Sequence, residues 1–197
     1  MKKSRKEAKN AIEQRLSERK KERDADGRAV IHMTVNDDDE FLSVFSANDT
    51  PVISEDVAEF LENSTASLLP RQPLTLRIHS GCIDEKEQEL YGKSIKEYYA
   101  GKYISQKWQL RKNAFIVGTL TLLGILILAI AVFLEYRFES VIWAEVLDIA
   151  AWVLLWEAVD ISAFKNRGIR LQKMRYLSYM DMKIEYLNIG KTERNRK

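Results

Sequence analysis

The strongest constraint on the fold is an uncharged apolar segment at residues 114–134, which reads AFIVGTLTLLGILILAIAVFL. It contains no proline, and a helix of this length rises ~30 Å at ~1.5 Å per residue, the thickness of a hydrocarbon core. A soluble helix is rarely apolar on every side over so long a run. The sequence therefore predicts an integral membrane protein whose first membrane-spanning helix lies here.

A second apolar segment at residues 141–164 predicts a second membrane-spanning helix. It differs from the first because it contains four acids, namely Glu145, Asp148, Glu157 and Asp160. A charged residue near the centre of a spanning helix costs roughly 2.5–3.5 kcal/mol on insertion scales, and less near the ends. A soluble or interfacial helix remains the alternative for this segment.

Basic residues flank the two segments at their outer ends. They are Arg111 and Lys112 before the first segment, and Lys165 and Arg167 after the second. Because positive residues favour the cytoplasmic side, a hairpin at residues 111–168 in the plasma membrane would leave both termini in the cytoplasm. The single cysteine, Cys82, excludes an intramolecular disulfide and agrees with a reducing compartment.

Residues 1–27 form a charged arm that is predicted to be a solvated helix or a disordered segment. The arm lacks the apolar run of a secretory signal. At a membrane, anionic lipid headgroups are its nearest anionic partner, and nucleic acid is not favoured.

Residues 28–110 predict a small cytoplasmic α+β domain with a mixed α/β sheet. Alternating apolar residues predict a strand at residues 29–35, and residues 36–40 predict a turn. Residues 41–46 then predict a returning strand, and the alternation at residues 74–78 predicts a third strand.

Helix signals separate and follow these strands. Ser54, with acids in the next two positions, predicts a helix start. Asp84 and Glu87 have the spacing of a capping box and predict a long helix that runs close to, or straight into, the first apolar segment. In the basic tail, residues 169–197, a helix at 169–177 and a strand at 180–186 are predicted, and the strand would return to the sheet. The alternative for the tail is an amphipathic helix at the membrane surface.

The acidic face of the second apolar segment is the candidate site of function. Two E-x-x-D motifs place the four carboxylates within about half of the helix circumference at ~100° per residue, and Trp152 and Trp156 lie on that side as candidates for aromatic packing. The acids then form an ion or proton site or an assembly seam. The alternative is that they lie near the interfaces and pair with flanking bases such as Lys165 by snorkelling.

An enzyme site is poorly supported. His32 and His79 are the two histidines, and both are predicted on outward faces of strands, with Cys82 in the loop nearby. Residues 37–40 (DDDE) lack the spaced ligands and the glycine of a calcium loop, and the chain has no phosphate-binding glycine loop or zinc-ligand spacing. We therefore expect no catalytic residue, no cofactor and no bound metal.

The segment WEAVD at residues 156–160 follows a charge-free helix and precedes a basic tail. In these features the chain resembles uncharacterised bacterial two-pass membrane proteins with an acidic second helix. The likeness covers the hairpin and, loosely, residues 74–103. It implies a bacterial plasma membrane and supplies no activity.

Two functional hypotheses follow. The first is a non-enzymatic, membrane-anchored interaction or regulatory protein that assembles through the acidic helix face, as a homo-oligomer or with another membrane protein. The alternative is a small transporter or channel subunit in which Glu145, Asp148, Glu157 and Asp160 line an ion or proton path. That alternative requires an oligomer, because two helices alone do not enclose a path.

Overall fold

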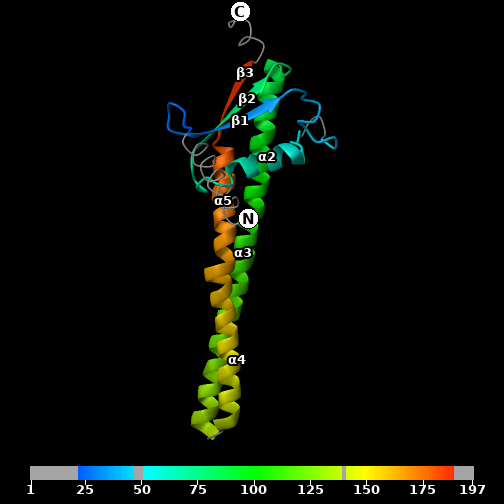
Figure 1. The fold of residues 1–197 in the computed structure, drawn as a ribbon. Coiled ribbons are helices and arrows are strands. Elements are labelled where there is room, and N and C mark those ends of the chain that lie inside the picture. The colour runs from blue at the N-terminus through cyan, green and yellow to red at the C-terminus, as the bar shows by residue number, and fades with distance from the viewer. Residues whose placement is uncertain (1–21, 47–50, 139–140, 189–197) are drawn as a thin grey trace, which may run out of the picture. The chain divides into compact units, whose positions relative to one another are not determined.

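The computed structural model describes residues 22–46, 51–138 and 141–188 (Figure 1). The strands are β1 (Ala29–Val35), β2 (Leu74–Ser80) and β3 (Lys183–Asn188). The helices are α2 (Glu55–Thr65), α3 (Glu85–Phe138), α4 (Val141–Asp160), the π-helical turn η1 (Ile161–Lys165) and α5 (Asn166–Met180). The chain divides into two compact units: a sheet unit, up to Lys102 and from Met174 onward, and a helical unit at Tyr103–Lys173.

The sheet unit contains three strands in the order β1-β2-β3, and both neighbouring pairs are parallel. In this register Ile31, Leu76 and Ile184 lie side by side on adjacent strands. The predicted strand in the tail is therefore confirmed as β3, which does return to the sheet, but it begins at Lys183 and not at residue 180, because α5 continues to Met180. Parallel neighbours need a crossover connection, which α2 supplies between β1 and β2.

The predicted returning strand at residues 41–46 is wrong. The strand beside β1 is β2, and Leu42 forms an isolated antiparallel bridge with Ile53 instead. The physical reason is the burial of Phe41, which is 2% exposed and stacks on Tyr91 with 4.3 Å between the ring centroids. This contact fixes the segment to the core, so that it does not extend along the edge of β1.

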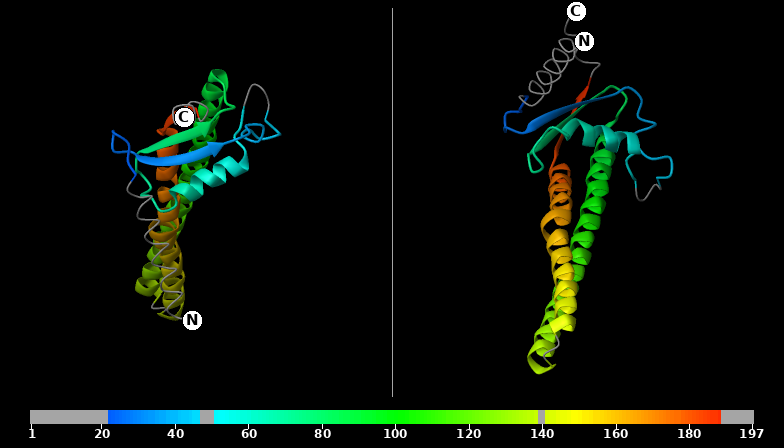
Figure 2. Two further views of the ribbon diagram at one scale, coloured as in Figure 1. Left: turned by 45° about the horizontal axis from the view of Figure 1, so that its top comes forward. Right: turned by 60° about the horizontal axis from the view of Figure 1, so that its bottom comes forward.

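One face of the sheet is covered by α2 and by the parts of α3 and α5 that belong to the sheet unit (Figure 2). Leu61, Leu76 and Ile95, from three different elements, are all 0% exposed. Burying a side chain of this size contributes about 1.5–3 kcal/mol. Tyr99 and Tyr179 close the core with 4.3 Å between their ring centroids, and burial raises the pKa of both hydroxyls.

Both predicted helix starts are present. The side chain of Ser54 accepts a hydrogen bond from the Val57 N–H at 3.4 Å. At the start of α3, the Glu87 N–H donates to Asp84 Oδ1 at 2.8 Å, and the Asp84 N–H donates to Glu87 Oε2 at 2.7 Å, which completes the capping box. From there α3 continues to Phe138, so the predicted long helix does run straight into the apolar segment.

Within the helical unit, α3 and α4 pack together through small residues. Ala144, Ala151 and Ala158 are buried at intervals of seven, which is the repeat of a coiled-coil seam. On α3, a Cβ at Gly124 would lie 3.0 Å from Leu155 Cγ. Among the described residues one helix, α3, is long and apolar enough to cross a membrane, by length and composition.

The turn η1 interrupts the regular helix between α4 and α5. Asn166 is also buried, and it follows Ala158 by eight positions, one more than the repeat. A π-helical turn accommodates one additional residue. Asn166 accordingly lies on the side that meets α3, where its Oδ1 accepts a hydrogen bond from Asn113 Nδ2 at 2.8 Å.

Candidate functional site

The structure places the four predicted acids of α4 in two separate groups. Glu157 and Asp160 both contact Lys165, whose Nζ lies 2.8 Å from Glu157 Oε1 and 3.1 Å from Asp160 Oδ2. Lys165 follows Asp160 by five residues, across the π-helical turn. A flanking base therefore pairs with these two acids, as one of the sequence hypotheses predicts.

Glu145 and Asp148 lie apart from Lys165 and share a hollow with Glu135 of α3. The hollow measures about 180 Å³ and is otherwise lined by apolar residues. The sequence analysis did not include Glu135 in this group. Glu135 lies on α3, and no sequence pattern near it indicates that it would face Glu145 and Asp148 of α4.

Trp152 and Trp156 project away from the packed helix pair. Their side chains are 62% and 69% exposed, and they border an open hollow together with Leu120 and Glu157. Aromatic packing by these two residues would therefore involve lipid or another chain, and it stays a prediction.

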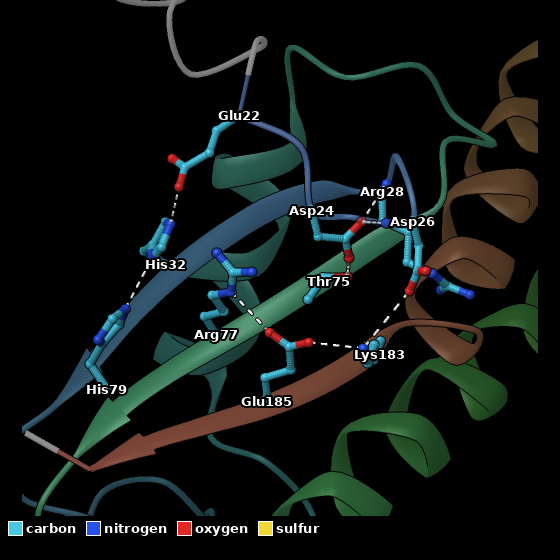
Figure 3. Close-up of polar contacts among 10 residues, drawn as sticks. All are labelled: Glu22, Asp24, Asp26, Arg28, His32, Thr75, Arg77, His79, Lys183 and Glu185. Carbon is cyan, nitrogen blue, oxygen red and sulfur yellow. Dashed lines mark hydrogen bonds and ion pairs between the residues drawn. The ribbon is translucent and has the colours of Figure 1, made fainter.

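The outward face of the sheet carries a connected set of charged side chains (Figure 3). Arg77 Nε donates to Glu185 Oε2 at 2.9 Å, and Lys183 Nζ lies 2.9 Å from Glu185 Oε1. The hydrogen bond from Arg77, together with the one from Lys183, lowers the pKa of the Glu185 carboxyl. Opposite charges facing each other on β2 and β3 also stabilise the pairing of these strands.

The loop before β1 is tied to the same face by Asp24. Thr75 Oγ1 donates to Asp24 Oδ2 at 2.6 Å, and the N–H groups of Asp26 and Arg28 donate to Asp24 Oδ1 at 3.0 and 2.8 Å. The hydrogen bond from Thr75 is the main cause that lowers the pKa of Asp24. Gly27 in this loop has a φ of 74°, a conformation that favours glycine.

The two histidines face outward, as predicted, and contact each other (Figure 3). His32 Nδ1 lies 2.9 Å from His79 Nε2, and His32 Nε2 lies 2.8 Å from Glu22 Oε1. In a hydrogen bond between two ring nitrogens, one ring donates an N–H and the other accepts it. Cys82 Sγ instead contacts Ser80 Oγ at 3.1 Å.

A further hollow lies at the carboxyl end of β1, between β1 and α2, and measures about 370 Å³. Its apolar floor is formed by Met33, Val35, Phe41, Val57 and Phe60. Its polar rim is formed by Asn36, Asp37, Glu40, Ser54 and Asp56. Ligands of α/β folds commonly bind outside the carboxyl ends of the strands. The sequence singled out residues 37–40 only as a turn, and it did not indicate that Asp56 would join them.

The three consecutive aspartates of that turn bring carboxylate oxygens within 4.8 Å of one another. Asp37 Oδ1 accepts a hydrogen bond from the Asp39 N–H at 3.2 Å, and Asp38 Oδ2 accepts one from the Tyr91 hydroxyl at 2.9 Å. Burial and the bond to Asp38 raise the pKa of Tyr91. These contacts give Asp37 and Asp38 a role in closing the turn.

No family model, curated protein or solved structure shows significant similarity to this chain. The resemblance of WEAVD to two-pass membrane proteins stays a prediction.

Proposed function

We propose that this protein is a non-enzymatic interaction protein, anchored in a bacterial plasma membrane by a two-helix hairpin that leaves its sheet unit in the cytoplasm. The first support is the apolar part of α3. Its most apolar 18 residues have a mean hydropathy of 2.8, and 11% of them are buried. The core helix of a soluble protein would be mostly buried, so this exposed apolar surface favours contact with lipid.

The pairing of β2 with β3 is the observation that carries the proposal. β2 precedes α3 in the chain, β3 follows α5, and the two strands form one hydrogen-bonded ladder. Two strands that are hydrogen-bonded to each other must lie on the same side of a bilayer, because an open sheet does not cross the hydrocarbon core. If α3 crosses the membrane, the chain must cross back before β3.

α4 has the properties required of the returning segment. It is 20 residues long, which corresponds to ~30 Å of helix. Ala144, Ala151 and Ala158 are buried, whereas large apolar side chains such as Ile149 and Val153 are 65% and 63% exposed. Large apolar side chains exposed along a helix of this length suit a lipid environment. The pairing of Glu157 and Asp160 with Lys165 reduces the cost of acids near one end.

Single-cysteine labelling in bacterial spheroplasts tests this proposal. In a Cys82→Ser background, cysteines are introduced at three exposed positions: Ser67 in the sheet unit, Tyr136 near the end of α3, and Gln172 in α5. A membrane-impermeant maleimide should label Tyr136→Cys from outside, and it should label the other two only after lysis. Labelling of Gln172→Cys from outside would mean a single crossing and would contradict the proposal.

A small transporter or channel subunit is the second candidate function, and the hollow shared by Glu135, Glu145 and Asp148 favours it. Carboxylates on a spanning helix commonly belong to ion or proton pathways. In liposomes, Glu145→Gln combined with Asp148→Asn should abolish proton or cation flux while leaving the oligomer intact. An interaction protein should show no flux in either form, and native mass spectrometry of the extracted protein should reveal a fixed ratio with itself or with a partner.

A further inference from the structure

We propose that the hollow between β1 and α2 is a docking site for a basic amphipathic segment of a partner protein. This inference rests on the proposed function and names the partner's chemistry. The rim carries three exposed carboxylates, from Asp37 and Glu40 after β1 and from Asp56 in the first turn of α2. None of the described residues that line the hollow is a lysine or an arginine. Among the residues that the structure describes, the rim therefore lacks a cation of its own.

Below this rim the surface is apolar. Phe41 and Val57 belong to the buried core, and Phe60, which is 38% exposed, forms a partly open wall. A volume of about 370 Å³ lies within the range of ~300–1,000 Å³ that is typical of ligand sites. Val44 and Phe45 follow Phe41 in the chain and are 87% and 94% exposed. Exposed apolar groups rimmed by polar residues mark interaction sites.

The negative charge around the hollow favours a positively charged partner. Between Ala29 and Pro70 the sequence contains nine acidic residues and no lysine or arginine, although the whole chain has a net charge of +2. A surface of one sign attracts the opposite charge, accelerates association and rejects partners of like charge. Anionic lipid headgroups and nucleic acid are thereby disfavoured as occupants.

An amphipathic helix meets both requirements of the site. Such a helix docks by laying its apolar stripe into a groove, with its charged residues at the edges. Leucines on one side would contact Phe60, and lysines beside them would lie against the three carboxylates of the rim.

The test measures peptide binding to the full chain in nanodiscs of phosphatidylcholine, which has no net charge. The probe is a fluorescein-labelled peptide of about 14 leucine and lysine residues, with leucines at helical spacing, and binding is followed by fluorescence anisotropy. Saturable binding is expected. The combination Asp37→Asn, Glu40→Gln and Asp56→Asn should weaken binding about ten-fold, and added salt should weaken it further. The same peptide with glutamate in place of lysine should not bind.

Two variants keep the test specific. Phe60→Ala removes part of the floor without changing charge and should also weaken binding. Glu85→Gln, Glu89→Gln and Glu97→Gln make the same charge change on the exposed surface of α3 and should bind as the parent does. Circular dichroism establishes that each variant is folded before its affinity is compared.

The outcomes separate this inference from the proposed function. Unchanged affinity in the rim variant and in Phe60→Ala would overturn the docking site, and so would an equal loss in the α3 control. Tighter peptide binding after deletion of residues 1–20 would make the chain's own charged arm the occupant and would refute the assignment to a partner. Absence of binding by a chain that gives the two-pass labelling pattern would defeat only this inference, whereas loss of that pattern would defeat the proposed function.

Discussion

The packing of α3 against α4 depends on Gly124, because a single methyl group added there would meet the other helix. A Cβ at this position would lie 3.0 Å from Leu155 Cγ and 3.3 Å from the backbone oxygen of Ala151. Favourable contacts of carbon atoms lie at about 3.5–4.0 Å, so Gly124→Ala must displace Leu155 or separate the helices. Gly118 on the same helix is a matched control, since a Cβ there meets nothing within 4 Å.

Two opposing contributions set the change in the free energy of unfolding that Gly124→Ala causes. Overpacking costs about 1–3 kcal/mol, whereas replacing a glycine inside a helix by alanine gains roughly 0.8–1 kcal/mol in helix propensity. Gly118→Ala gains helix propensity without any cost of overpacking, because a Cβ at Gly118 meets no neighbouring atom. We therefore expect Gly124→Ala to lower the free energy of unfolding by about 0–2 kcal/mol and Gly118→Ala to raise it by about 1 kcal/mol. The informative quantity is the difference between the two variants, about 1–3 kcal/mol.

The assay is unfolding of the purified protein in mixed micelles of a mild detergent and dodecyl sulfate, followed by far-ultraviolet circular dichroism. Gly124→Leu adds a larger group at the same place and should lower the transition midpoint further than Gly124→Ala does. Equal shifts of the midpoint in Gly124→Ala and Gly118→Ala would refute the close approach of α3 and α4. A stabilised Gly124→Leu would refute it independently.

Three further predictions concern the sheet unit. Leu76→Ala should lower the free energy of unfolding by about 2–5 kcal/mol, because Leu76 is 0% exposed, and denaturant titration measures this loss. Asp84→Ala should destabilise the start of α3 by about 1 kcal/mol, through loss of the bond to the Glu87 N–H, and should speed amide hydrogen exchange there. Glu185 has a lowered pKa in the folded protein, so its stabilising contribution is complete above its unfolded pKa of ~4.3 and is lost as the pH falls through the folded value. Glu185→Gln should therefore flatten the acid side of the stability profile, and an unchanged profile would contradict the assigned role of Arg77.

Signals that act within one helical turn or one strand could be predicted from the sequence. Ser54, and Asp84 with Glu87, predicted the starts of α2 and α3 because a cap bonds to N–H groups two or three residues away. Alternation predicted β1, β2 and β3 because successive side chains point to opposite faces. Lys165 could be predicted as a partner of Glu157 because a long basic side chain beside an apolar segment reaches back to acids near its end.

Contacts between distant segments could not be predicted in this way. Alternation indicates that residues 29–35 form a strand but not which strand lies beside it, and a turn of acids directly after it suggested a hairpin. The burial of Phe41 against Tyr91 decided otherwise. Arg77 and Glu185 are 108 positions apart, so their pairing follows from the register of β2 and β3, which no local pattern specifies.

The π-helical turn η1 connects two features that the sequence presents as unrelated. The alanines at 144, 151 and 158 keep a repeat of seven, whereas the buried Asn166 follows Ala158 by eight positions. Without the extra residue in the turn, a regular helix would rotate Asn166 by ~100° away from Asn113. The same turn brings Lys165 to both Glu157 and Asp160, although Lys165 follows Asp160 by five positions. One local irregularity therefore maintains the polar contact between α3 and α5 and brings one cation to the acid pair at the end of α4.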